Sequence, residues 1–165
     1  MSRSLFVGFG AWTIGGGGWR YSWGPQEDTA SIATIRHALE LGINWIDPAA
    51  VYGLGHSEEV IGRLLRELSP SERPMVFTKC GLVWDDRDPM AEPRRILKPE
   101  SIRRECDASL RRLGVDRIDL YQFHWPDETG TPVEESWAEM VRLIKQGKIR
   151  LAGVSNFDVS LLPEM

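Results

Sequence analysis

The stretch from Gly42 to Glu58, which reads GINWIDPAAVYGLGHSE, decides the fold because it joins a helix end, a strand, a loop and a helix start. Gly42 is typical of the residue that ends a helix. The run Ile43–Ile46 is too continuous in apolar character for a strand with one wet face, so we expect a buried parallel strand. Ser57 then opens a helix whose first turn is acidic, which is favourable against the helix dipole. The stretch therefore predicts one unit of a strand–helix repeat.

The same alternation of short apolar runs and helical patterns continues on both sides of this stretch. The expected strands are Leu5–Phe9, Ile43–Ile46, Met75–Thr78, Ile118–Phe123 and Ile149–Val154. The expected helices run from about 29 to 41, 57 to 68, 99 to 113 and 131 to 146. Asp28 is a candidate N-cap for the first helix, and Thr131 with Glu134 forms a candidate capping box for the fourth. Helices therefore separate all the expected strands.

A repeated strand–helix unit with right-handed crossovers makes either an open, doubly wound sheet or a closed barrel. An open dinucleotide-binding sheet is expected to carry G-x-G-x-x-G directly after a strand. The segment Gly8–Thr13 has threonine in place of the third glycine, and Gly53–Glu58 has glutamate there. The sequence therefore predicts an α/β fold of the TIM-type (β/α) barrel class.

Composition and charge narrow the class of protein further. Of the 165 residues, 42% are apolar and 27% are charged, which suits a single globular domain. A net charge of −4 disfavours nucleic acid and anionic membranes as partners. The first residues lack an apolar signal core, and Cys80 and Cys106 form no disulfide or zinc-binding pattern. We therefore expect reduced thiols and a cytoplasmic location, with no export signal or membrane anchor.

Polar side chains stand at the ends of the expected strands, at the rim that holds the chemistry of a barrel. They include Asp47, Lys79 and His124, and Tyr52 follows in the loop after Asp47. A lysine that points into a barrel mouth needs a carboxylate partner, and Asp47 on the neighbouring strand is available. A nearby ammonium lowers the pKa of a tyrosine, so Lys79 would make Tyr52 a better proton donor. His124 could orient a substrate oxygen, and the four side chains together predict a group that protonates an alkoxide as it forms.

Several motifs in the chain resemble those of the aldo-keto reductase family. Residues 42–58 resemble the signature in which Asp and Tyr are five residues apart and G-x-G-x-S-E follows. Residues 77–79 (FTK), 119–126 (DLYQFHWP) and 153–157 (GVSNF) are similar to that family's lysine, histidine and nicotinamide-amide motifs, in the same order. Pro48 stands where the family commonly has threonine, which leaves every catalytic side chain in place. The resemblance covers essentially the whole chain.

The resemblance implies an NADPH-dependent oxidoreductase that reduces small aldehydes or ketones to alcohols, with Tyr52 as the general acid. NADH is the alternative cofactor, and no metal is expected. Ser155 and Asn156 match positions that bind the nicotinamide carboxamide. The further candidate cofactor residues are Asp47, Trp12, Thr13 and Ile14. The candidate substrate residues, chosen because they lie on loops at the same rim, are Val51, Trp84, Trp125, Trp19 and Trp23.

The barrel of this family has eight strands, and the chain carries only about the first five strand–helix units. We interpret residues 1–165 as a single domain that is the N-terminal part of an incomplete barrel. The first and fifth strands would then be unpaired edges with exposed apolar faces. A homo-oligomer is expected if the short chain is complete.

Two other functions, metal-dependent hydrolysis and cofactor binding without turnover, are compatible with parts of the sequence. A metal hydrolase could use His37, His56, His124 and Asp47, but no strand carries an H-x-H pattern. A catalytically silent half-barrel would bind a nicotinamide cofactor or a protein partner without turnover. It would bind NADPH without carbonyl-dependent oxidation, and the presence of all four catalytic side chains favours the enzyme.

Overall fold

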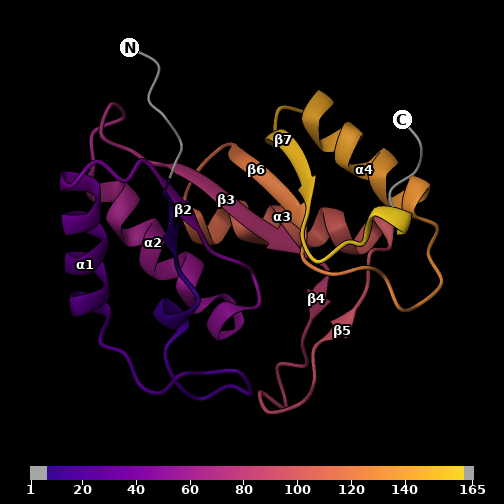
Figure 1. Cartoon of the computed structure of the whole chain (residues 1–165), viewed down its shortest axis with the longest axis horizontal. Coiled ribbons are helices and arrows are strands. Elements are labelled where there is room, and N and C mark those ends of the chain that lie inside the picture. The colour runs from indigo at the N-terminus through magenta and orange to yellow at the C-terminus, as the bar shows by residue number, and fades with distance from the viewer. Residues whose placement is uncertain (1–6, 162–165) are drawn as a thin grey trace.

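A parallel sheet forms the centre of the molecule in the computed structural model, which describes residues 7–161 (Figure 1). Its strands are β1 (Phe9–Gly10), β2 (Trp45–Asp47), β3 (Met75–Cys80), β6 (Ile118–Phe123) and β7 (Ile149–Val154). Each strand pairs in parallel with the next one in that order. Spatial order therefore follows chain order, as in a barrel, whereas the strand order of a doubly wound sheet reverses. The predicted set of parallel strands is confirmed.

The ends of two strands differ from the prediction. β3 extends to Cys80, so Lys79 lies within the strand, opposite Gln122 of β6, rather than directly after it. β1 begins only at Phe9, where pairing with Ile46 of β2 begins. The expected first strand started at Leu5, and its residues 5 and 6 lie outside the described residues.

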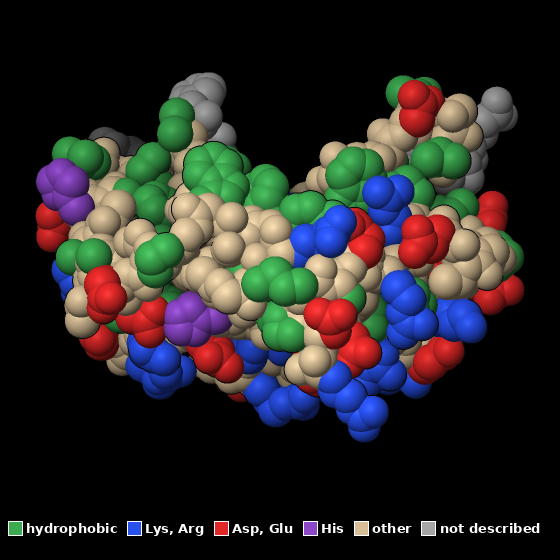
Figure 2. Space-filling model, turned by 90° about the horizontal axis from the view of Figure 1, so that it is seen from below, with side chains coloured by type: hydrophobic (Ala, Val, Ile, Leu, Met, Phe, Trp, Pro, Cys, Tyr) green, Lys and Arg blue, Asp and Glu red, His purple; other side chains and the backbone are tan. Residues whose placement is uncertain are grey.

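Four helices connect the consecutive strands of this sheet. They are α1 (Asp28–Glu40), α2 (His56–Glu67), α3 (Pro99–Leu113) and α4 (Val133–Lys145). Each helix contacts the next, and the apolar residues between helices and sheet form the main core, with Ile46, Leu64, Tyr121 and Met140 fully buried. Figure 2 shows the resulting outline as a crescent with one open side. The core holds the strand ends in fixed places along one rim.

The start of α4 corrects the predicted capping box. The helix begins at Val133 and no side chain caps it, so the assignment of Thr131 and Glu134 as a capping box is wrong. The Thr131 N–H donates to Asp127 Oδ1 at 3.0 Å instead, which keeps this residue in the preceding loop. Asp28 lies in the first turn of α1 and is not its N-cap. The Asp28 carboxylate instead contacts His56 Nε2 at 2.7 Å and accepts from Arg63 at 2.6 Å, both on α2, which local sequence does not reveal.

The long polar segment between β3 and α3, residues 82–98, contains a hairpin that the sequence did not predict. β4 (Leu82–Val83) and β5 (Arg94–Arg95) pair in antiparallel register. Strands of two residues carry no readable alternation of apolar and polar side chains, so periodicity does not detect them. The outer side of β5 is held by Glu128, whose Oε1 accepts the Arg95 N–H at 3.0 Å and whose own N–H donates to the Arg95 carbonyl at 3.1 Å. β5 is therefore held on one side by β4 and on the other by Glu128.

Two short 3-10 segments, η1 (Thr13–Gly15) and η2 (Tyr52–Gly55), contact each other beside the ends of β1 and β2. Gly53 has φ +62°, and a Cβ atom at this position would lie 2.1 Å from the carbonyl oxygen of Gly15. Glycine satisfies both the positive φ and the close approach, which a residue with a Cβ atom does not. The contact fixes the backbone that carries Tyr52.

β1 and β7 are the edges of the sheet, as predicted. Leu151 of β7 is 55% exposed, so this edge presents apolar surface. Among residues 7–161, no strand covers the outer side of either edge.

Candidate active site

An ion pair between a buried lysine and a half-buried aspartate joins the ends of β2 and β3. Lys79 Nζ donates to Asp47 Oδ2 at 2.8 Å and to the Pro48 carbonyl oxygen at 2.9 Å. Lys79 is only 6% exposed, and its burial lowers the pKa of the ammonium, while the carboxylate of Asp47 opposes that change. The predicted carboxylate partner of the lysine is therefore present, and the pair carries no net charge.

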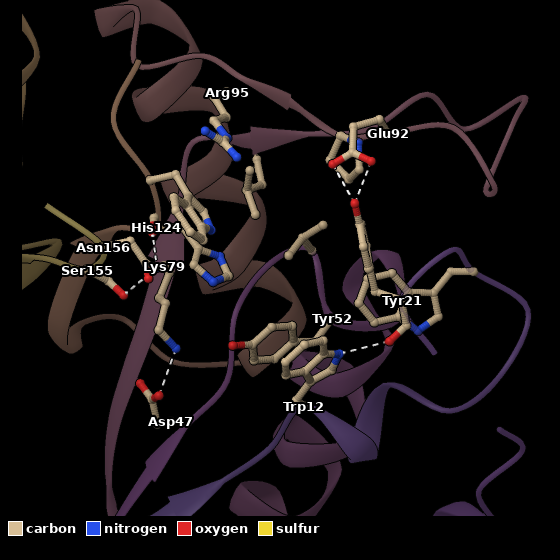
Figure 3. A pocket seen from close by; sticks show the side chains of 15 residues that line it. Trp12, Tyr21, Asp47, Tyr52, Lys79, Glu92, Arg95, His124, Ser155 and Asn156 are labelled. Carbon is tan, nitrogen blue, oxygen red and sulfur yellow. Dashed lines mark hydrogen bonds and ion pairs between the residues drawn. The ribbon is translucent and has the colours of Figure 1, made fainter. Parts of the chain in front are cut away.

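Tyr52 lies beside this pair, held by aromatic contacts on two sides. Its ring stacks on Trp12 at a centroid distance of 5.8 Å and meets the His124 ring edge-on at 5.6 Å. Lys79 Nζ is 5.3 Å from the centre of the Tyr52 ring. Figure 3 shows the four predicted catalytic side chains facing one pocket, although they come from β2, η2, β3 and the end of β6.

The pKa of Tyr52 is raised to about 12, which contradicts the predicted lowering. Burial is the main cause, and the carboxylate of Asp47 adds to it. The predicted effect of Lys79 does not prevail, because the positive charge of its ammonium is balanced by the adjoining Asp47. The Tyr52 phenol is therefore fully protonated at neutral pH.

His124 follows β6, and its backbone N–H donates to the Cys80 carbonyl oxygen at 2.9 Å, which continues the pairing of β6 with β3. Burial, and after it the charge of Lys79, lowers the pKa of this imidazole to about 3. The ring is therefore neutral above pH 5, with one N–H donor and one acceptor nitrogen. Among the described residues, the ring nitrogens of His124 have no hydrogen-bond partner, so a ligand in the pocket can accept a hydrogen bond from the ring N–H.

Ser155 and Asn156 follow β7 on the same rim. Asn156 adopts φ +60°, and its Nδ2 donates to the His124 carbonyl at 2.9 Å and to Ser155 Oγ at 3.1 Å. This leaves the Ser155 hydroxyl as a donor and the Asn156 amide oxygen as an acceptor, with no partner for either within residues 7–161. A free donor beside a free acceptor matches a carboxamide, which offers one of each.

These side chains line one pocket with a volume of about 460 Å³. Its predicted lining residues are Trp12, Trp19, Asp47, Val51, Tyr52, Lys79, His124, Trp125, Ser155 and Asn156. The lining residues that sequence reasoning missed are Tyr21, Leu82, Glu92, Pro93 and Arg95. All of them except Tyr21 belong to the unpredicted hairpin and its turn, and the local signal for them was the length of the segment 82–98 that contains them.

Four candidate residues do not line this pocket. Thr13 lies exposed in η1, whereas Ile14 is buried in the main core. Trp23 is 74% exposed and packs beside Trp12 at a ring distance of 5.9 Å. Trp84 lies on the other side of the hairpin, where its Nε1 donates to Asp86. An aromatic residue on a rim loop is thus not sufficient for pocket contact, since the loop's path decides which way it faces.

The loop after β1 and the β4–β5 turn are joined across the pocket entrance. Tyr21 Oη lies 2.5 Å from both carboxylate oxygens of Glu92, and Arg20 Nε is 2.9 Å from Glu92 Oε2. The Trp12 indole donates to the Tyr21 carbonyl at 3.0 Å, which ties this contact to the ring stacked on Tyr52. One charged cluster therefore fixes both loops at the edge of the pocket.

The described part of the chain contains no group of three or more His, Cys, Asp and Glu side chains arranged to hold a metal ion. None of the helices within residues 7–161 combines the length and the apolar character that crossing a bilayer requires.

Known proteins share this sequence and this arrangement. Residues 7–165 match the model of the aldo/keto reductase family. The chain is 41% identical over 153 residues to the aldo-keto reductase YhdN of Bacillus subtilis, covering 93% of this chain and 44% of that protein. It is 40% identical over 167 residues to the NADH-specific methylglyoxal reductase of Escherichia coli, covering 96% of this chain and 50% of that protein. The solved structure of the glycerol dehydrogenase AKR11B4 from Gluconobacter oxydans matches with a TM-score of 0.82 at 47% identity, over 93% of this chain and 45% of that chain.

The chain spans about half the length of the curated relatives it matches. Its sheet corresponds to part of the TIM-type barrel of these enzymes, which confirms the predicted fold class. Because the family model matches nearly all of its residues, and two relatives align with it at about 40% identity, this chain belongs to the aldo/keto reductase family.

Proposed function

We propose that this chain carries the proton-donating half of a carbonyl reductase site, in which Tyr52 protonates a small aldehyde or ketone as it is reduced to an alcohol. The observation that carries the proposal is the convergence of Tyr52, the Lys79–Asp47 pair and His124 on one pocket. Membership of the aldo/keto reductase family supports it. Residues 1–165 are proposed to act as one domain, the N-terminal part of a barrel.

A nicotinamide cofactor, when bound, would supply the hydride for this reaction. The free donor of Ser155 and the free acceptor of Asn156 fit the carboxamide of such a cofactor. NADPH is the proposed cofactor, with NADH as the alternative, since the relative from Escherichia coli is named an NADH-specific reductase. The cytoplasm is the proposed location, and the two buried cysteines, both without a disulfide, agree with it.

The chemistry proposed for this chain's own residues is proton transfer and orientation. The neutral His124 imidazole donates a hydrogen bond to the substrate oxygen and turns it toward the Tyr52 hydroxyl. As negative charge develops on that oxygen, it becomes a much stronger base than a phenolate, so Tyr52 can protonate it despite a pKa of about 12. Lys79, 5.3 Å from the Tyr52 ring centre, then stabilises the phenolate that remains.

The test follows NADPH absorbance with the purified chain and an activated aromatic aldehyde, beside Tyr52→Phe. The substitution keeps the ring stacked on Trp12 and removes only the proton donor. Loss of a general acid typically costs 10²- to 10⁴-fold in rate. We expect a fall of that order in kcat with an unchanged circular dichroism spectrum. Equal turnover by the two proteins would contradict the role of Tyr52.

A second candidate function is the silent half-barrel, in which the pocket would bind a nicotinamide cofactor without turnover and the edges β1 and β7 would bind a partner. Its signature is quenching of tryptophan fluorescence by NADPH without carbonyl-dependent oxidation. Trp12, which lines the pocket and stacks on Tyr52, is a suitable reporter of binding. Size-exclusion chromatography of the same sample measures whether the chain associates with a second copy through these edges.

A further inference from the structure

We propose that Arg95 forms an anion-binding subsite, so that the preferred substrates are carbonyl compounds bearing a carboxylate or phosphate group. This inference rests on the proposed function, because it assigns a substrate class to the same pocket. It begins with the charges that line the pocket, which are those of Asp47, Lys79, Glu92 and Arg95.

All of these charges except that of Arg95 have a partner. Lys79 pairs with Asp47 at 2.8 Å, and Glu92 is neutralised by Arg20 at 2.9 Å with a further hydrogen bond from Tyr21. The Arg95 guanidinium has no acidic side chain within 4.0 Å among residues 7–161. With His124 neutral, the pocket therefore has one uncompensated positive charge, and this charge is permanent.

Although Arg95 is an exposed residue, its guanidinium contacts an aromatic ring. Its central carbon lies 4.6 Å from the centre of the Trp125 ring, a cation–π contact, and Trp125 directly follows His124. The Arg95 backbone is bonded to Glu128 on one side and paired with Leu82 of β4 on the other. A planar guanidinium oriented by this ring can bind a carboxylate or phosphate through two parallel hydrogen bonds.

The register of the hairpin turns Arg95, and not its neighbour, toward the pocket. Arg95 is opposite Leu82, and both line the pocket, whereas Arg94 is opposite Val83 and both line a separate surface depression with Trp84. Cross-strand partners share a face of the hairpin, so the two arginines face opposite ways. Arg94 therefore provides a matched control with the same charge on the same strand.

The position of Arg95 fits the far end of a substrate rather than its reacting carbonyl. In Figure 3, Arg95 and Asp47 lie at opposite ends of the pocket, with His124 between them. A carbonyl oxygen bound at Tyr52 and His124 would leave the other end of a short molecule near the guanidinium. Trp19, Val51 and Trp125 supply apolar surface for the carbon skeleton between these ends.

The kinetic test compares 4-carboxybenzaldehyde with its neutral 4-carbamoyl analogue, and 4-formylphenyl phosphate forms a third arm. The unaltered chain is expected to favour at least one anionic aldehyde about tenfold in kcat/KM, because one charge-assisted contact on a partly exposed guanidinium is worth about that factor. Arg95→Gln should abolish the preference, Arg95→Lys should retain part of it, and Arg94→Gln should leave it unchanged. The preference should also fall as salt is raised.

A binding measurement separates this inference from the proposed function. Quenching of tryptophan fluorescence by 4-carboxybenzyl alcohol, against 4-carbamoylbenzyl alcohol, needs no turnover. Carboxylate binding that weakens about tenfold in Arg95→Gln but not in Arg94→Gln supports the subsite even if no aldehyde is reduced. Equal turnover of the anionic and neutral aldehydes, or equal binding of the anionic and neutral alcohols, overturns the inference. A higher KM for NADPH in Arg95→Gln, with the acid-to-amide ratio unchanged, also overturns it and assigns the arginine to the cofactor.

Discussion

Glu105 provides a prediction about stability that can be worked from the structure. This carboxyl group lies on α3 and is 9% exposed, and it accepts hydrogen bonds from the Gly81 N–H at 2.8 Å and from Ser101 Oγ at 3.0 Å. No basic side chain pairs with it within 4.0 Å among the described residues. Burial raises the pKa of Glu105 from 4.5 to about 7. At neutral pH the folded protein therefore holds a carboxyl group that resists ionisation, whereas the unfolded chain ionises it freely.

The sign and size of the effect follow from this difference. The protonated form is favoured in the folded state, so the stability it contributes is complete below pH 4.5 and is lost as the pH rises through about 7. At about 1.36 kcal/mol per unit of pKa, the full loss is about 3 kcal/mol, of which about 2.5 kcal/mol falls between pH 5 and pH 8. Glu105→Gln imitates the protonated acid, because its amide oxygen can accept from Gly81 and its amide N–H can donate to Ser101 Oγ.

The assay is urea denaturation of both proteins at pH 5 and pH 8, followed by tryptophan fluorescence. The free energy of unfolding of Glu105→Gln should gain about 2.5 kcal/mol relative to the unaltered chain on going from pH 5 to pH 8. Glu139→Gln is the control, since this buried carboxylate binds Arg103 through two hydrogen bonds and also contacts Arg142. Its substitution should lower stability at pH 8 by about 1–3 kcal/mol. A difference between Glu105→Gln and the unaltered chain that is the same at both pH values would refute the reasoning.

Three other substitutions test separate features. Gly53→Ala places a methyl group 2.1 Å from a carbonyl oxygen and should lower the free energy of unfolding, measured by chemical denaturation, by more than about 2–3 kcal/mol. The control Gly130→Ala, at φ +87° with no atom within 4 Å, should lower it by only about 1 kcal/mol. Equal losses in the two variants would contradict the close-contact argument. Asp47→Asn leaves the Lys79 ammonium buried without its carboxylate, so the free energy of unfolding should fall by about 1–3 kcal/mol at pH 7. This loss should shrink as the pH rises toward 10 and the ammonium loses its proton, which thermal denaturation across that range measures. A loss that does not depend on pH would argue against an unpaired ammonium. His124→Asn should make stability less sensitive to acid, because the pKa of His124 is lowered to about 3 and only the unfolded chain takes up this proton below pH 6.5. Between pH 7 and pH 4.5 the unaltered chain should lose about 2–3 kcal/mol more in its free energy of unfolding than the variant, measured by urea denaturation. Parallel pH profiles of the two proteins would disprove the assignment.

The parallel sheet and its helices were readable from the sequence because the signals are local and repeated. Continuous apolar runs such as Ile118–Phe123 indicate strands buried on both faces, and the structure has β6 at those same residues. The helix Pro99–Leu113 was bounded by a proline at its start and by Gly114, which adopts the left-handed conformation at its end. The failed capping box at Thr131 shows the limit of such signals, because a competing local contact with Asp127, four residues earlier, keeps Thr131 in the loop before the helix.

The convergence of the candidate catalytic residues also followed from the sequence. Asp47, Lys79 and His124 lie at or next to the carboxyl ends of neighbouring parallel strands, and these ends meet at one rim. The protonation of Tyr52 did not follow. Its pKa depends on how deeply the ring is buried and on the neutralisation of Lys79 by Asp47, and neither quantity is encoded in spacing.

By itself, then, the sequence determined the order of the parallel strands and the helices between them, the position of the four candidate catalytic side chains on one rim, and the family resemblance. Only the tertiary structure decided how the pocket is enclosed. Tyr21 and Glu92 are 71 positions apart and close one side of its entrance, and Arg95 faces the pocket because a two-residue strand pairs it with Leu82. Periodicity and caps reflect interactions within a few residues, whereas the direction of a loop side chain depends on contacts between segments far apart in the chain.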